Sequence, residues 1–174
     1  MRKLLAALSI GLLSFTMQAK AENTDLQLSL TPDVALHDKD TFITGLSLNI
    51  WGENPQNFAS IGFINGSSNR SQSRFAASSS YSSGFSFGLV NYTEAYKGLH
   101  IGFDNTSSVK FTGAQIGFIN QANAVSGTQI GLVNYCKYMN RGIQIGLINV
   151  NAKDNNIEDV DTGAVIMPLV NWSF

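Results

Sequence analysis

Three segments of this chain repeat almost letter for letter, and they decide its fold. They read Gly113-Ala-Gln-Ile-Gly-Phe-Ile-Asn120, Gly127-Thr-Gln-Ile-Gly-Leu-Val-Asn134 and Gly142-Ile-Gln-Ile-Gly-Leu-Ile-Asn149. Two further copies precede them, Gly84–Asn91 and Gly98–Asn105. Self-similarity at a short fixed period is the sequence signature of repeat architectures. The copies therefore predict one domain built from equivalent structural units.

Two positions define the repeat: a glycine at the fifth residue and an asparagine at the eighth. The five glycines follow one another at spacings of 14, 15, 14 and 15 residues. We take both positions as structural. They are Gly88, Asn91, Gly102, Asn105, Gly117, Asn120, Gly131, Asn134, Gly146 and Asn149.

Residues within each copy alternate in character. The second, fourth and sixth residues are mainly apolar, whereas the third and fifth are mainly glutamine, glycine or another polar residue. A period of two with one apolar face predicts β-strand. The asparagine and the short polar stretch after it are typical of a strand end and a turn. Further strands are expected at Asp25–Leu30, Phe42–Trp51, Phe58–Asn65 and Ala164–Phe174, which makes about eight to ten in all.

Two all-β architectures fit these strands. The first is a small outer-membrane-type β-barrel of about 8–10 strands, because eight strands of ~10 residues with their turns need about 150 residues. Its apolar faces would meet lipid, and the glutamine and glycine faces would fill its interior. The alternative is a parallel β-solenoid with one repeat per coil, an apolar core and a ladder of asparagines at one corner. We favour the barrel and keep the solenoid as the alternative.

The N-terminal residues indicate export. Arg2 and Lys3 precede the apolar stretch Leu4–Met17, and Ala19-Lys20-Ala21 is an A-x-A cleavage site, so residues 1–21 are expected to be a signal peptide. Residues 22–174 would then form a single all-β repeat domain. Residues 1–21 hold three of the 11 basic residues and none of the 12 acidic ones, so this domain carries a net charge of −4. That charge disfavours nucleic acid as a partner.

The end of the sequence also suggests an envelope protein. Trp172 and Phe174 share one face of the last expected strand. A terminal strand that ends in phenylalanine is similar to the recognition signal of bacterial outer-membrane proteins. We therefore take these two residues as a C-terminal strand signal.

The repeat G-x-Q-I-G-[LF]-[VI]-N resembles the units of a bacterial family of surface-repeat-containing proteins of the Leptospira type. The resemblance covers Phe42–Phe174. It implies an exported, envelope-associated protein and transfers no catalytic residue. The expected localisation is the outer membrane or cell surface of a Gram-negative bacterium, with the periplasm or secretion as the alternative.

The sequence contains no recognisable motif for catalysis. His37 and His100, its two histidines, cannot make a metal site by themselves. His100 and Asp104 are expected on one face of a strand, about 13 Å apart, and Ser86 could be a cross-strand neighbour of one of them. We predict no catalytic residue, no cofactor and no metal. Cys136 is expected to be a small packed residue.

Two irregular segments interrupt the pattern. The serine-rich stretch Ser67–Ser86 is expected to be a loop, and the acidic stretch Asp154–Asp161 a second one. Neither has the spacing of a known ligand-binding motif.

These observations predict an exported cell-envelope repeat protein with a structural or surface-interaction role. Its partners would be outer-membrane lipid and the assembly machinery if it is a barrel, together with an unidentified surface partner. One alternative is a secreted or periplasmic β-solenoid that binds or adheres. The other is a membrane-embedded lipid-modifying enzyme, in which His100 would act.

Overall fold

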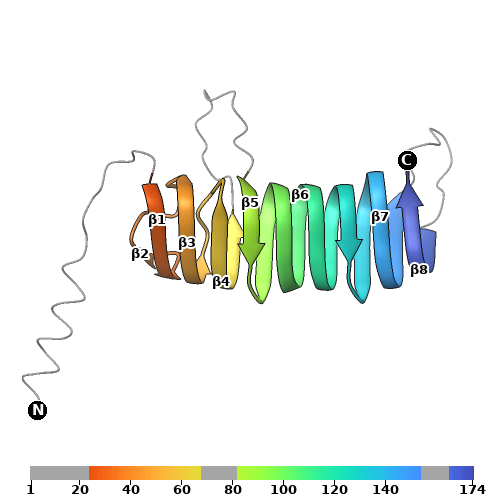
Figure 1. Ribbon diagram of the computed structural model, residues 1–174, viewed down its shortest axis with the longest axis horizontal. Helices are drawn as coiled ribbons and strands as arrows, with labels where there is room; N and C mark the ends of the chain where they lie inside the picture. Colours follow the sequence, from red (N-terminus) through yellow and green to blue (C-terminus); the bar gives the residue numbers. More distant parts are fainter. Residues whose placement is uncertain (1–23, 68–81, 154–164) are drawn as a thin grey trace, which may run out of the picture.

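The computed structural model describes residues 24–67, 82–153 and 165–174. The expected signal peptide, the acidic loop at 154–161 and most of the serine-rich segment lie outside these residues. The described chain forms one open eight-stranded sheet (Figure 1). The predicted all-β class is confirmed. The strands are β1 (Thr24–Thr31), β2 (Val34–Ala35), β3 (Ile43–Gly52), β4 (Ala59–Ser67), β5 (Ser82–Phe87), β6 (Val90–Ile130), β7 (Val133–Lys153) and β8 (Val165–Ser173).

Neighbouring strands run in parallel along β1–β3–β4–β5–β6–β7. From β5 onward the paired residues are one repeat of 14 or 15 residues apart, so Asn120 lies opposite Asn134 and Gly127 opposite Gly142. Figure 1 shows the result as a ribbon that winds in successive coils. Among the described strands, antiparallel pairing is confined to the two ends, β1–β2 and β7–β8. The meander of an up-and-down barrel has antiparallel neighbours throughout.

Each coil contains two extended segments joined at a corner. In the coil that begins at Gly113, Gln115 and Asn120 are both buried, whereas the consecutive residues Phe118 and Ile119 both face outward. Two outward side chains in a row shift the alternation by one residue. We call residues one to seven of each copy side A. It consists of an extended segment, residues one to five, and the corner, residues six and seven. The residues after the asparagine form side B.

The polar stretch after each asparagine was predicted to be a turn, and that prediction was wrong. β6 and β7 continue through it as side B. Its small residues face inward, as Ala122 does at 0% exposure, and its polar residues face outward, as Gln121 does. A small residue alternating with a polar one gives no hydrophobic alternation, so side B left no strand signal in the sequence.

Asparagine side chains form a ladder inside the corner. Six consecutive hydrogen bonds of 2.7–3.0 Å join the Nδ2 of one asparagine to the Oδ1 of the next. From the second member to the sixth, each Nδ2 also donates to the backbone carbonyl of the fourth residue in the next copy, as Asn120 does to Ile130 at 2.9 Å. The ladder comprises Asn49, Asn65, Asn91, Asn105, Asn120, Asn134 and Asn149.

The third position of the repeat forms a second buried column. Gln129 donates to Gln115 and Gln144 donates to Gln129, each at 2.8 Å. Asn171 of β8 donates to Gln144 at 3.0 Å and so joins the column to the last strand. At the other end, Gln27 exchanges hydrogen bonds with the backbone of His37 at 2.9 and 3.0 Å. Amide side chains therefore hold the closing segments at both ends of the sheet.

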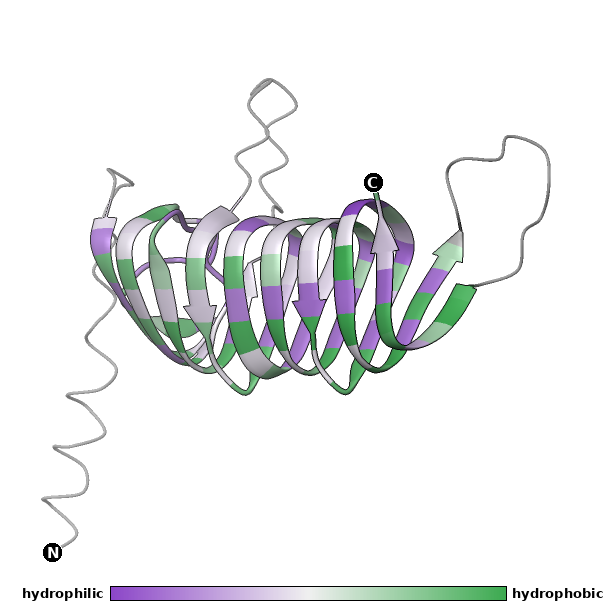
Figure 2. Cartoon of the chain, turned by 45° about the vertical axis from the view of Figure 1, so that its right-hand side comes forward, coloured by the Kyte–Doolittle hydropathy of each residue, from purple (hydrophilic) through white to green (hydrophobic). Residues whose placement is uncertain are grey.

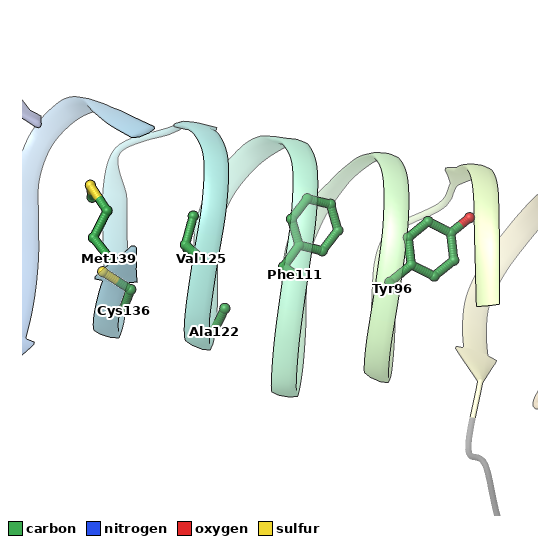
Figure 3. Packing of buried hydrophobic residues seen from close by; sticks show 6 residues of the cluster. All are labelled: Tyr96, Phe111, Ala122, Val125, Cys136 and Met139. Carbon is green, nitrogen blue, oxygen red and sulfur yellow. The ribbon is translucent and has the colours of Figure 1, made fainter. Parts of the chain in front are cut away.

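A small apolar cluster fills the opposite corner of the interior. Its side chains follow one another along the axis of the winding, one or two from each coil (Figure 3). It consists of Tyr96, Phe111, Ala122, Val125, Cys136 and Met139. The interior is therefore part amide ladder and part narrow apolar stack.

The glycine at the fifth position leaves room for the asparagine ladder. A Cβ on Gly117 would lie 2.6 Å from the Nδ2 of Asn105. In β3 the two residues are exchanged, with Asn49 at the fifth position and Gly52 at the eighth. A Cβ on Gly52 would overlap the side-chain amide of Asn49. The corner therefore accepts one amide side chain per coil, from either position.

Replacing one member of the asparagine ladder should destabilise the whole protein. Asn120→Ala removes the acceptor of Asn105 and the donor to Asn134 and to the Ile130 carbonyl. Leaving such buried groups unpaired should lower the free energy of unfolding by about 3 kcal/mol. Urea unfolding measures this loss. The control is Gln121→Ala, which alters an exposed residue beside it. Equal midpoints for the two variants would show that the ladder does not hold the coils together.

The exchange in β3 can be tested by a double-mutant cycle. Asn49→Gly shortens the ladder and Gly52→Asn overfills the corner, so each should cost about 2 kcal/mol of unfolding free energy. The double variant restores the usual order of glycine and asparagine and should unfold within about 0.5 kcal/mol of the native chain. Additive losses in urea unfolding would show that the two positions do not share one space.

Candidate functional site

The outer surface of side A and its corner is apolar along the length of the sheet. Apolar bands recur from coil to coil in Figure 2. The strand pairing aligns β1, β3 and β4 with the five copies of the repeat, which makes eight copies and 16 residues at the fourth and sixth positions. All 16 are leucine, isoleucine or phenylalanine, and all but Ile101 are between 37% and 62% exposed. They are Leu28, Leu30, Leu48, Ile50, Ile61, Phe63, Phe87, Leu89, Ile101, Phe103, Ile116, Phe118, Ile130, Leu132, Ile145 and Leu147. We call this set the apolar face.

This arrangement corrects one prediction from the sequence. The solenoid alternative placed these apolar residues in the core and the glutamine and glycine residues on the surface. In the structure the glutamine and asparagine columns are buried and the apolar face is outside. The outward direction of the face is the one that the barrel interpretation assumed. The reason is steric, because the space inside the coil is taken up by the amide columns and a Cβ at the fifth position would meet them.

Charge is nearly absent from this side. The second, fourth, sixth and seventh positions of the eight copies hold one charged residue, Asp104, which occupies a seventh position. It lies at the corner, where its carboxylate accepts a hydrogen bond of 3.0 Å from the Thr106 hydroxyl. A continuous apolar surface of this kind marks an interaction site in a soluble protein.

Both tryptophans of the chain lie at the margins of the apolar face. Trp51 occupies a seventh position in β3, is 41% exposed and donates from Nε1 to the Tyr92 hydroxyl at 3.0 Å. That hydroxyl in turn donates to Glu53. Trp172 of β8 pairs with Ile143 and is 55% exposed, so it extends side A past the last coil. The two indoles therefore stand near opposite ends of the face.

Side B is mainly hydrophilic on its outer surface. Its outward residues include Thr106, Ser108, Gln121, Asn123 and Lys137, with Val109 as an exposed apolar residue among them. The winding is consequently two-sided, with one apolar and one polar broad face. This contrast arises although the chain folds as one continuous sheet.

The ten repeat-defining residues come together inside the corner, where the asparagines bond and the glycines make room for them. Their role is thus to position the apolar face. Trp172 and Phe174 lie at the C-terminal end, where Phe174 is 94% exposed. Their role as an export or assembly signal stays a prediction. The ten residues that the five copies from Gly84 to Asn149 contribute to the apolar face were recognised in the sequence as one stripe, whereas the six from β1, β3 and β4 were not.

Ser86, His100 and Asp104 do not form a catalytic arrangement. Ser86 lies opposite His100 in the sheet, but its hydroxyl donates to the Oδ1 of Asn91 at 2.7 Å. His100 faces inward, whereas Asp104 is at the outer corner. The prediction that these two share a face was wrong, because the corner between them reverses the alternation. No proton can pass directly between side chains on opposite sides of the backbone.

His100 is a packed interior residue. Its ring is 0% exposed and lies 4.2 Å from the Tyr96 ring and 4.9 Å from the Phe111 ring, measured between centroids. Neither ring nitrogen has a hydrogen-bond partner. Burial lowers the pKa of His100 to about 3, so the ring is neutral at physiological pH. Burial also raises the pKa of the Cys136 thiol to about 12, which fits a packed rather than a reactive cysteine.

Among residues 24–67, 82–153 and 165–174, no group of three or more His, Cys, Asp or Glu side chains is placed to hold a metal ion. Within the same ranges there is no helix long and apolar enough to cross a membrane.

Comparison of the chain with protein-family models, with curated proteins and with solved structures gives no match. The resemblance to the surface-repeat family therefore stays a prediction that rests on the repeat motif. The apolar face remains the feature of the described surface that most clearly indicates an interaction.

The neutral, unpaired His100 should make stability depend on pH. Its pKa is lower in the folded chain than the usual 6.5, so the unfolded state binds more protons between about pH 6.5 and pH 3. The folded state therefore loses stability as the pH falls through this window, by up to about 1.4 kcal/mol per pH unit. His100→Gln should remove this part of the slope and give Gln115 an acceptor. Urea unfolding at pH 7 and pH 4.5 measures both effects. The same pH slope in both proteins would contradict the prediction.

Proposed function

We propose that this chain is an exported β-solenoid of the bacterial cell envelope that serves as a binding scaffold rather than an enzyme. The parallel register, with one repeat per coil, supports the solenoid over the barrel that the sequence favoured, because an up-and-down barrel needs antiparallel neighbours. The asparagine ladder supports it as well. Equivalent side chains can bond only if every copy runs in the same direction.

The observation that carries the binding role is the apolar face. Eight copies spaced ~4.8 Å apart, with five to six residues across each, span about 35 by 15 Å, or roughly 500 Å² in projection. Soluble monomers rarely expose contiguous apolar surface beyond a few hundred Å². Exposed leucine, isoleucine and phenylalanine side chains at every copy therefore favour a chain that is completed by an apolar partner.

The non-enzymatic role is supported by the state of the polar groups. His100 is buried and neutral, and Ser86 is bonded within the interior. The glutamine and asparagine columns hold adjacent coils together, and the buried hydroxyls of Thr93 and Ser107 bond each other. Amides neither titrate nor act as nucleophiles at physiological pH. The export role is supported by the signal-peptide pattern at residues 1–21 and by the motif resemblance.

Cell fractionation tests this proposal. The native chain should be recovered from the envelope, and its mass should be that of a chain that starts at Glu22. It should show no heat-dependent shift in gel mobility. Phe118→Glu combined with Leu132→Glu should weaken its retention there. The matched control, Ser108→Glu combined with Gln121→Glu, adds the same charge on side B and should leave retention unchanged.

Three results would overturn the proposal. Recovery of the uncleaved chain from the cytoplasm would exclude export. Carbonate-resistant recovery in the outer membrane with a heat-dependent shift would restore the barrel. Equal retention of the side A and side B variants would show that the apolar face binds nothing in the envelope.

A further inference from the structure

We infer that the partner of the apolar face is the hydrocarbon of a phospholipid bilayer, so that the chain lies flat on a membrane with side A inserted and side B in water. This inference rests on the proposed function and names the partner of the same surface. The chain would be attached to one leaflet without crossing it.

The chemistry of the face matches hydrocarbon. Its 16 residues are all aliphatic or phenylalanine. The charged residues on side A are Asp104, at the corner, and Asp25, at the first position of β1, at the N-terminal end of the face. The fourth position is isoleucine in the last four copies, from Ile101 to Ile145, whereas the sixth position changes among leucine, isoleucine and phenylalanine with no regular order. A fluid acyl layer accommodates such an uneven surface. A second copy of the chain would have to match its ridges and hollows to pack at the density of a protein interface.

The backbone under the face meets the requirement that a bilayer imposes. Peptide groups near hydrocarbon must find their partners within the protein. Side A achieves this through parallel pairing between copies. At the corner, where β5 gives way to β6 and β6 to β7, the amides of Leu89 and Leu132 still donate to the carbonyls of Phe63 and Phe118, at 2.9 and 3.0 Å. The Asn120 amide covers the Ile130 carbonyl beside them.

The margins of the face suit a membrane–water interface. Trp51 and Trp172 each present an exposed indole there, and Tyr92 links Trp51 to the carboxylate of Glu53. Tryptophan and tyrosine collect at the headgroup level, where one end of the ring is apolar and the other is wet. Interfacial segments bury their apolar side chains about 5–10 Å deep, which is about the length of the outward side chains of one face. The polar outer surface of side B then stays in solvent.

The two tryptophans provide the test. The purified protein is mixed with phosphatidylcholine vesicles, and the fluorescence of Trp51 and Trp172 is recorded. On insertion the emission should shift to shorter wavelength, and lipids brominated on their acyl chains should quench it. Flotation with the vesicles should persist in 1 M salt, because apolar contact is not screened.

Matched variants separate the face from the rest of the surface. Phe118→Glu combined with Leu132→Glu should weaken vesicle binding about 100-fold, since two inserted apolar side chains are lost. Ser108→Glu combined with Gln121→Glu should stay within about twofold of the native chain. Urea unfolding in the absence of lipid shows that both double variants are folded.

The outcomes are separable. A blue shift without quenching by brominated lipid, together with a dimer in sedimentation, would overturn the inference and assign the face to a second copy. Binding only to anionic vesicles and only at low salt would overturn it as well, as would equal loss of binding in both double variants. If the protein does not bind vesicles but the side A double variant is still retained less in the envelope, the lipid inference is wrong and the proposed binding scaffold stands.

Discussion

The structure depends on the asparagine ladder inside the corner of each coil. A side-chain amide has both a donor and an acceptor, so it can pass one hydrogen bond forward and receive one from behind. Seven asparagines form the ladder: Asn49 begins it, Asn149 ends it, and the five between them both donate and accept. These five also bond the backbone of the next copy. A buried amide without partners is costly. Each coil is therefore stable in one register only, the one that places its asparagine over the previous one.

The ladder explains both invariant features of the repeat. Glycine is needed at the fifth position because a Cβ there would overlap both the carbonyl oxygen of the preceding copy's glycine and the side-chain amide of that copy's asparagine. The exchange of Asn49 and Gly52 in β3 shows that the constraint is on the space and not on the order of the residues. A column of polar amides behind side A also leaves no room at that wall for large aliphatic side chains. The apolar residues that give the strands of side A their alternation thus lie outside, and the fold itself creates an exposed apolar surface.

Much of this arrangement was predictable from the sequence. The expected strands near Asp25–Leu30, Phe42–Trp51 and Phe58–Asn65 appear as β1, β3 and β4, and the last one as β8. The apolar face was recognised as a stripe, because a period of two places alternate residues on one side. The corner at Phe118 and Ile119 was not recognised from the sequence. Both residues are apolar, so nothing in the hydrophobic pattern shows that both face outward. The same omission placed His100 and Asp104 on one face.

The sequence by itself determined the period of the repeat, the strands of side A and the alternation along residues one to six of each copy. Alternation is unchanged when the two faces are exchanged or when every second strand is reversed, so it carries no information on which face is buried or which way a strand runs. Only the tertiary structure decided these two points. Neighbouring copies had to run in parallel for their asparagines to meet, and the amides had to lie inside because water would otherwise take the place of their neighbours.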